Sequence, residues 1–335
     1  MTGTEYGELI ASKKGADREA ALCHAVQNDQ LPSIFYNNYR TITSKAVIDG
    51  KERVLQMRCA ADFLAAGTDA DPFYVGGWTS TAQQIADYFH CILPSEKIAR
   101  LIYEQADLRV PMPNPGEPWY DTKNHVPRNI EDSGAWIAAN KKHIAALGPI
   151  AGREKKLVAG HMKDILQTKS GLLGSCPASL GGCLTLFGAL QDGKWPVQGV
   201  YKGHQWNYGP DYSHGIRLVH REALLDGVAV DLFDIFKDPK LCVLVTTEGP
   251  YVPWLPPPTA GGPTGCGPGG GSGGGGSSKP PGGSKAPAEP VDTRASPSLL
   301  EAAAPFLALG FIGFIAFKFL KSQPDSHQGA DKDFL

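Results

Sequence analysis

Three features that often reveal a protein's class are missing from this 335-residue chain. The polar N-terminus has no apolar core segment, so no secretory signal peptide is expected there. The 32 basic residues do not outnumber the 34 acidic ones, so the positive charge that a nucleic-acid partner usually requires is absent. The seven cysteines show no Cys-x-x-Cys pair or Cys/His ligand spacing, which argues against a structural zinc site. We expect free buried thiols, with Cys176 and Cys183 as the pair that an oxidising compartment would join.

Glycine and proline are plentiful instead, with 40 and 27 copies, and many lie in a tract that begins at Thr259. Such a tract has few side chains that can pack, so it is predicted to be a flexible tether. An apolar run from Ala302 to Leu320 follows, with Lys318 as its only charge. About 20 apolar residues are long enough to cross a bilayer as a helix, so the lipid bilayer is the predicted partner of this run. The predicted organisation is a globular body over 1–258 with a possible sub-boundary near 150, a tether over 259–298, a transmembrane helix over 299–321 and a polar tail over 322–335.

The charges beside this run leave two orientations open. Lys318 and Lys321 lie at its end and Glu301 precedes it, so the positive-inside rule places the tail in the cytoplasm and the body outside. The lack of an N-terminal signal favours a cytoplasmic body instead. Assembly into the internal membrane of a virion would satisfy both observations. The predicted location is therefore a single-pass C-terminal anchor in a host cell membrane or in such a virion membrane.

The predicted secondary structure of the body differs between its two halves. Helical periodicity and capping signals predict helices over Asp17–Gln27, Thr79–Ile92, Ser95–Gln105 and Glu131–Leu147, with Thr79 as an N-cap. Strands are predicted at Arg40–Ile48 and Val54–Leu64, and Asp192–Gly193 is a hairpin signal. After Gly152, short apolar runs predict further strands at Leu157–Leu166, Leu184–Leu190, Val197–Tyr201, Gly215–Val219 and Leu241–Thr246. The predicted fold class is α+β, with a helix-rich N-terminal half, a strand-rich C-terminal half and one C-terminal transmembrane helix.

Histidines mark the candidate site. Four of the nine fall between Gly160 and His220, in two segments where histidine stands beside glycine, aspartate and a basic residue. The first segment is Val158–Asp164, and the second is Gly203–Leu218. Histidine exchanges a proton near neutral pH, and a neighbouring carboxylate or guanidinium sets its charge and tautomer.

Two chemical models and one structural alternative fit these residues. In the first model, His214 is a general acid or base, oriented by Asp211 or Asp164, and Arg217 holds an anionic substrate group. In the second, His161, His204 and His214 bind a zinc ion and leave its fourth position for water. In the alternative, the histidines form structural hydrogen bonds that close loops. The candidate catalytic residues are His214, His204, Asp211, His161 and Asp164, and the candidate substrate-binding residues are Arg217, Ser213, Lys163 and Trp206.

The stretch Ser213-His214-Gly215-Ile216-Arg217-Leu218, with His204 upstream, resembles the active-site stretch of L,D-transpeptidases of the YkuD type. That family has a nucleophilic cysteine directly after the Ser-His-Gly. Here Ile216 follows Gly215, so the resemblance implies related site geometry without that nucleophile.

Most of residues 17–250 also resembles a bacterial family for which we know no established activity. Its members carry Gly-His-Lys-Lys-Asp-like and Asp-Tyr-Ser-His-Gly-Ile-Arg-Leu-like segments. These correspond to Gly160–Asp164, where Met162 departs from the usual lysine, and to Asp211–Leu218. The resemblance implies a shared fold and site and names no reaction.

Two functions follow as hypotheses. The first is a membrane-tethered hydrolase that acts on a cell-envelope polymer, above all peptidoglycan, for example as a lytic protein of a membrane-containing virus. A base-activated or metal-bound water, with zinc as the candidate cofactor, would replace the missing nucleophile. The second is a non-catalytic binding or structural module displayed on a cellular or virion membrane.

Overall fold

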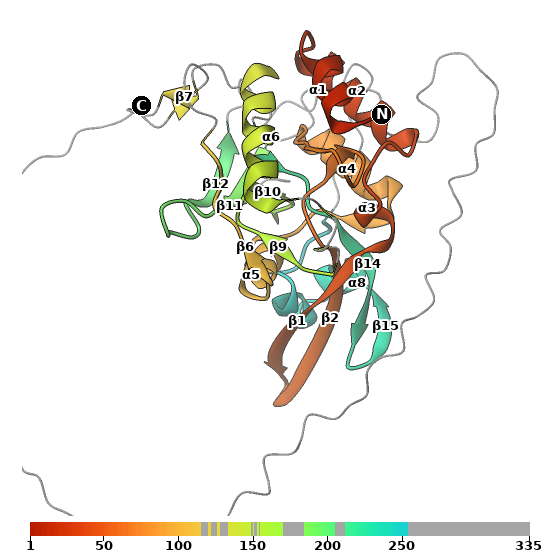
Figure 1. Cartoon of the computed structure of the whole chain (residues 1–335). Coiled ribbons are helices and arrows are strands. Elements are labelled where there is room, and N and C mark those ends of the chain that lie inside the picture. The colour runs from red at the N-terminus through yellow and green to blue at the C-terminus, as the bar shows by residue number, and fades with distance from the viewer. Residues whose placement is uncertain are drawn as a thin grey trace, which may run out of the picture. The chain divides into compact units, whose positions relative to one another are not determined.

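A computed structural model of the chain describes residues 1–114, 120–121, 126–127, 133–148, 150, 153, 155–169, 184–204 and 212–253 (Figure 1). All of them belong to one compact unit, Met1–Lys279. The predicted tether, transmembrane helix and polar tail all lie outside the described residues, the last of which is residue 253.

The larger sheet joins segments from both ends of the described chain. Its order is β1 (Tyr39–Ile48), β2 (Lys51–Ala60), β14 (Val219–Leu225) and β15 (Val228–Asp231), and β5 (Cys91–Ile92) pairs with β14. The turns Asp49–Gly50 and Asp226–Gly227 place both of their residues at positive φ, which Asp-Gly accommodates in tight hairpins. These two hairpins project side by side in Figure 1. The predicted strand at Arg40–Ile48 is confirmed as β1, whereas β2 begins and ends a few residues before its predicted range.

The smaller sheet carries the histidine-containing segments. Its order is β12 (Gln198–His204), β11 (Leu184–Gly188), β10 (Lys163–Leu166) and β13 (His214–Gly215). Asp192 and Gly193 lie at φ 50° and 73° in the turn between β11 and β12, where the hairpin signal was predicted. The predicted strand over Leu157–Leu166 is divided in two, because a bend at Gly160–Met162 separates β9 (Val158–Ala159) from β10.

Helices are distributed along the described chain, between Gly3 and Lys237. The predicted helix at Ser95–Gln105 is confirmed, because the Ser95 side chain accepts a hydrogen bond from the Ile98 backbone and starts α5. The predicted cap at Thr79 is wrong by one residue, since α4 has Trp78 at its N-cap. The helices are α1 (Gly3–Ile10), α2 (Gly15–Gln27), α3 (Ile34–Asn37), α4 (Thr79–Tyr88), α5 (Glu96–Glu104), α6 (Ser133–Leu147) and α8 (Leu232–Lys237), and the short pairs are β3 (Ala65–Gly67) with β4 (Pro72–Tyr74), β6 (Leu108–Arg109) with β9, and β7 (Tyr120–Asp121) with β8 (Val126–Pro127).

The strand predicted at Leu241–Thr246 is wrong. Leu241–Leu244 form a 3₁₀ helix. The Asp238 side chain accepts hydrogen bonds from the backbone amides of Lys240 and Leu241, which turns the chain at the point where an extended strand would begin.

The predicted fold class is wrong in its arrangement. The two ten-residue strands, β1 and β2, lie in the half that was predicted to be helix-rich, and they share a sheet with β14 and β15 from the other half. Within the described ranges, no helix is long and apolar enough to cross a membrane. The fold seen here is a mixed α+β unit with strands in both halves of the described chain.

The candidate site lies where two apolar clusters meet. One cluster includes Met162, Ile165 and Ile216 together with residues of α1, α2 and α4. The other includes Ala159, Val219 and residues of β1, β2, α5 and α8. The first histidine-containing segment therefore contributes to both clusters, and the second ends at Leu218 in one cluster, directly before Val219 of the other.

Candidate functional site

The two histidine-containing segments lie directly beside each other. Strands β10 and β13 are parallel, with Lys163 opposite His214 and Asp164 opposite Gly215. The Lys163 backbone amide donates a hydrogen bond of 2.7 Å to the Ser213 carbonyl. Residues in register on neighbouring strands share a face of the sheet. The fold therefore places Lys163 beside His214 on one face of the sheet and Asp164 beside Gly215 on the other, although the two segments lie far apart in the sequence.

Phe63 forms the apolar floor of this group. The Arg217 guanidinium lies 3.9 Å from the centre of the Phe63 ring, and the His161 ring meets the same ring edge-on at 5.0 Å. Gly215 lies so close that a Cβ built on it would stand 2.4 Å from Phe63 Cδ1. The glycine of the Ser-His-Gly stretch is therefore required by packing.

Replacing Gly215 with alanine is expected to lower the free energy of unfolding by about 1–3 kcal/mol, because the Phe63 ring must move to admit the methyl group. Gly199→Ala in β12 is the matched control, since a Cβ there meets nothing within 4 Å. That control is expected to change stability by no more than about 0.5 kcal/mol. Urea denaturation of both variants measures the difference, and equal midpoints would show that Phe63 does not constrain this position.

Arg217 is fully buried, with a relative exposure of 0%. Its guanidinium donates hydrogen bonds to the carbonyls of Ala60 (3.2 Å) and Val158 (2.8 Å). Its Nε atom lies 3.8 Å from Asp164 Oδ1. Arg217 thus joins β2, β9 and β10 from inside, and the anion-binding role predicted for it stays a prediction.

Asp164 and His161 have pKa values that are shifted in opposite senses. Burial raises the pKa of the Asp164 carboxyl to about 7, and the positive charge of Arg217 opposes part of this rise. Burial lowers the pKa of His161 well below its usual value, and the charges of Arg217 and Arg153 lower it further. Near neutral pH, His161 is an uncharged proton acceptor and a substantial share of Asp164 is a proton donor.

A second polar group lies behind His161. The Asp62 carboxylate accepts hydrogen bonds from Arg153 Nη1 (2.5 Å) and the Tyr74 hydroxyl (2.8 Å), and Arg153 Nη2 also donates to that hydroxyl (2.7 Å). The His143 ring of α6 lies 5.2 Å from the His161 ring, and burial lowers the pKa of His143 well below its usual value.

The sequence analysis did not predict these four residues. Asp62, Tyr74, Arg153 and His143 lie in separate segments with no diagnostic spacing. The available signal was a lone carboxylate, Asp62, inside the apolar run Ala60–Leu64.

The remaining predicted residues are placed as follows. Ser213 and His214 are buried, and Lys163 is half-buried. The backbone of His204 lies in β12 opposite Leu184. The His204 side chain, Asp211 and Trp206 lie outside the described residues.

The zinc model therefore stays a prediction. Among the side chains that the structure describes, no three His, Cys, Asp or Glu residues are arranged to hold a metal ion. The His204 side chain, the second ligand of the predicted triad, is not among them.

The prediction of free buried thiols is confirmed for Cys59, Cys91 and Cys242. It is wrong for Cys23, which is disulfide-bonded. Burial raises the pKa of Cys59 and of Cys91 to about 12. A thiol that stays protonated at neutral pH is a poor nucleophile, so neither residue replaces the cysteine missing at Ile216. Cys176 and Cys183 lie outside the described residues.

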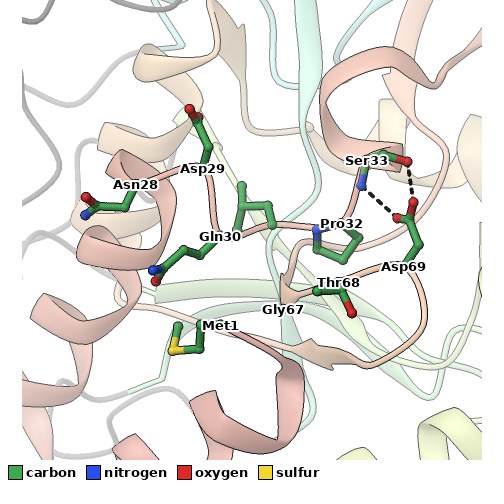
Figure 2. A pocket seen from close by; sticks show the side chains of 10 residues that line it. Met1, Asn28, Asp29, Gln30, Pro32, Ser33, Gly67, Thr68 and Asp69 are labelled. Carbon is green, nitrogen blue, oxygen red and sulfur yellow. Dashed lines mark hydrogen bonds between the residues drawn. The ribbon is translucent and has the colours of Figure 1, made fainter.

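A polar cavity of about 460 Å³ lies in another part of the molecule, between the end of α2 and the β3–β4 turn (Figure 2). There the Ser33 backbone amide and hydroxyl donate to the Asp69 carboxylate at 2.7 and 2.6 Å, which fixes the start of α3. The cavity contains none of the candidate residues. It is lined by Met1, Asn28, Asp29, Gln30, Leu31, Pro32, Ser33, Gly67, Thr68 and Asp69.

No protein-family model, curated protein or solved structure matches this chain. The two resemblances carried by Gly160–Asp164 and Asp211–Leu218 therefore stay predictions.

Proposed function

We propose that this protein is a hydrolase that uses general acid–base chemistry on a cell-envelope polymer, with peptidoglycan as the first substrate to test. The observation that carries the proposal is the parallel pairing of β10 with β13, which places Asp164 beside the Ser-His-Gly stretch and next to Arg217. His161 precedes the same strand and packs on Phe63 below Arg217. Peptidoglycan is proposed because this stretch resembles the active-site stretch of the YkuD-type transpeptidases.

The environments of His161 and Asp164 suit different steps of a hydrolysis. His161, held neutral, accepts a proton from an attacking water, and protonated Asp164 gives a proton to the leaving group. Water is the proposed nucleophile because Ile216 occupies the position of the family's cysteine. Arg217 contributes a fixed positive charge beside both groups, which favours negative charge that develops on the substrate.

The test compares fragment release from purified peptidoglycan by the full-length protein with release by His161→Gln and Asp164→Asn. Each substitution is expected to lower the rate at least about 100-fold, because loss of a general acid or base typically costs this much or more. His24→Gln, at an exposed position in α2, is the matched control and is expected to retain full activity. Wild-type release that survives both site substitutions would refute the assignment of the acid and the base.

A second function, a non-catalytic binding or structural module, is favoured by one observation. His161, His214 and Arg217 have relative exposures of 0–1%, as structural core residues do. If the protein is such a module, the folded wild type is expected to release no peptidoglycan fragments. His161→Gln is then expected to lower the melting temperature only. The same assay therefore separates the two functions.

A further inference from the structure

We infer that Asp62 is a positioning residue for His161, which holds the imidazole with its proton on Nε2 and leaves Nδ1 to accept a proton. Asp62 Oδ1 lies 3.3 Å from His161 Nε2. Both residues are buried, with relative exposures of 1% and 0%. The catalytic part of this inference rests on His161 being the base of the proposed function, whereas the tautomer does not.

The Asp62 carboxylate is fixed before it meets the histidine. A carboxylate has about four acceptor positions. Oδ2 receives the Tyr74 hydroxyl and Arg153 Nη1, and Oδ1 receives the Phe63 backbone amide at 2.8 Å. One acceptor position of Oδ1 remains, and His161 Nε2 lies 3.3 Å from this oxygen. The carboxylate therefore presents one open acceptor position to the imidazole.

The surroundings of His161 offer no competing partner. Neither of its ring nitrogens makes a hydrogen bond among the described residues, so the 3.3 Å approach of Nε2 to Asp62 Oδ1 is a close contact without hydrogen-bond alignment. Three aromatic rings surround it edge-on, namely Phe63 at 5.0 Å, Tyr74 at 5.1 Å and His143 at 5.2 Å. Nε2 is the ring nitrogen that lies close to the carboxylate, so a proton there is attracted to Oδ1, whereas a proton on Nδ1 would leave two acceptors, Nε2 and Oδ1, next to each other. A carboxylate beside a neutral imidazole thus selects the Nε2–H tautomer.

Three residues from different parts of the chain donate hydrogen bonds to the Asp62 carboxylate. Tyr74 ends β4, Arg153 lies in the segment that follows α6, and Phe63 follows Asp62 itself. Arg153 binds both the Asp62 carboxylate and the Tyr74 hydroxyl. The side chains of Asp62, Arg153 and Tyr74 therefore form a closed triangle of hydrogen bonds of 2.5, 2.7 and 2.8 Å. Such mutual bonds restrict the rotation of each group, which is the property that a positioning residue needs.

The test is an NMR measurement of the ¹⁵N chemical shifts of the His161 ring in the full-length protein at neutral pH. The expected result is a neutral ring protonated at Nε2 in the wild type, and a ring protonated at Nδ1 in the wild type would overturn the inference without any variant. In Asp62→Asn we expect the Nε2–H tautomer to lose its dominance, because the side-chain amide can present either a donor or an acceptor.

Tyr74→Phe is the matched variant, since it removes one hydrogen bond from Asp62 but leaves the carboxylate next to His161. It is expected to keep the Nε2–H tautomer. If Asp62→Asn also keeps that tautomer while it remains folded, Asp62 does not position the ring. Fragment release adds a separate readout: if the tautomer changes in Asp62→Asn while the wild type releases nothing, the inference stands and the proposed function fails.

Discussion

Arg217→Met is expected to lower the free energy of unfolding by about 3–5 kcal/mol, the usual cost of removing one partner from a buried charged network. The substitution leaves the carbonyls of Ala60 and Val158 without their donor and Asp164 without its counter-charge. Methionine keeps an unbranched apolar chain over Phe63, so loss of polar partners dominates the change. Chemical denaturation monitored by tryptophan fluorescence measures the effect.

Arg221→Met is the matched control for this prediction. Arg221 also lies over an aromatic ring, Phe233 at 4.0 Å, and also pairs with a carboxylate, that of Asp231. Its side chain is 28% exposed, however, so the expected loss is about 1 kcal/mol or less. Equal losses in the two variants would show that the burial of Arg217 has no energetic weight.

The second large effect is a pH dependence that differs in sign between the two site residues. His161 has a lowered pKa in the folded state, so below about pH 6.5 the unfolded chain binds a proton that the folded protein does not. Stability therefore falls as the pH falls, by at most about 1.4 kcal/mol per pH unit. Asp164 has a raised pKa of about 7, so between its ordinary pKa and 7 the folded protein holds the extra proton. Its contribution to stability therefore grows as the pH falls through this window, by up to the same amount.

These opposing contributions can be separated with two variants. Between pH 6.5 and 5.5, His161→Gln is expected to lose less stability on acidification than the wild type, and Asp164→Asn is expected to lose more. The two slopes are expected to differ by up to about 3 kcal/mol per pH unit. All other titrating groups are common to the three proteins, so the comparison removes their effect. Urea midpoints at several pH values provide the slopes, and parallel slopes in all three proteins would contradict the assigned shifts.

The sequence predicted the elements that depend on local pattern. Each of these patterns acts without help from distant residues. Alternation in Arg40–Ile48 predicted a strand, Asp192–Gly193 predicted a hairpin turn, and Ser95 predicted the start of a helix. It also identified both histidine-containing segments, because glycine and titratable residues gather there. The two segments lie side by side because a short strand in each, β10 and β13, pairs with the other.

The sequence did not predict what depends on pairing between distant segments. Strand β2 pairs with β14, so a sheet unites residues that were assigned to two differently composed halves. The hydrogen-bonded triangle of Asp62, Tyr74 and Arg153 forms only when three segments come together: the residues just after β2, strand β4 and the segment that follows α6. A buried carboxylate is acceptable only with such partners, so its presence in an apolar run indicates a network without naming its members.

Titration of His161 and Asp164 by NMR in the folded full-length protein tests the proposed acid and base directly. We expect the His161 ring to titrate well below its ordinary value and the Asp164 carboxyl to titrate near pH 7. Such values would establish an acid and a base that coexist at neutral pH. Midpoints near 6.5 for His161 and near 4 for Asp164 would contradict this assignment, because the two groups would then be an ordinary histidine and an ordinary carboxylate.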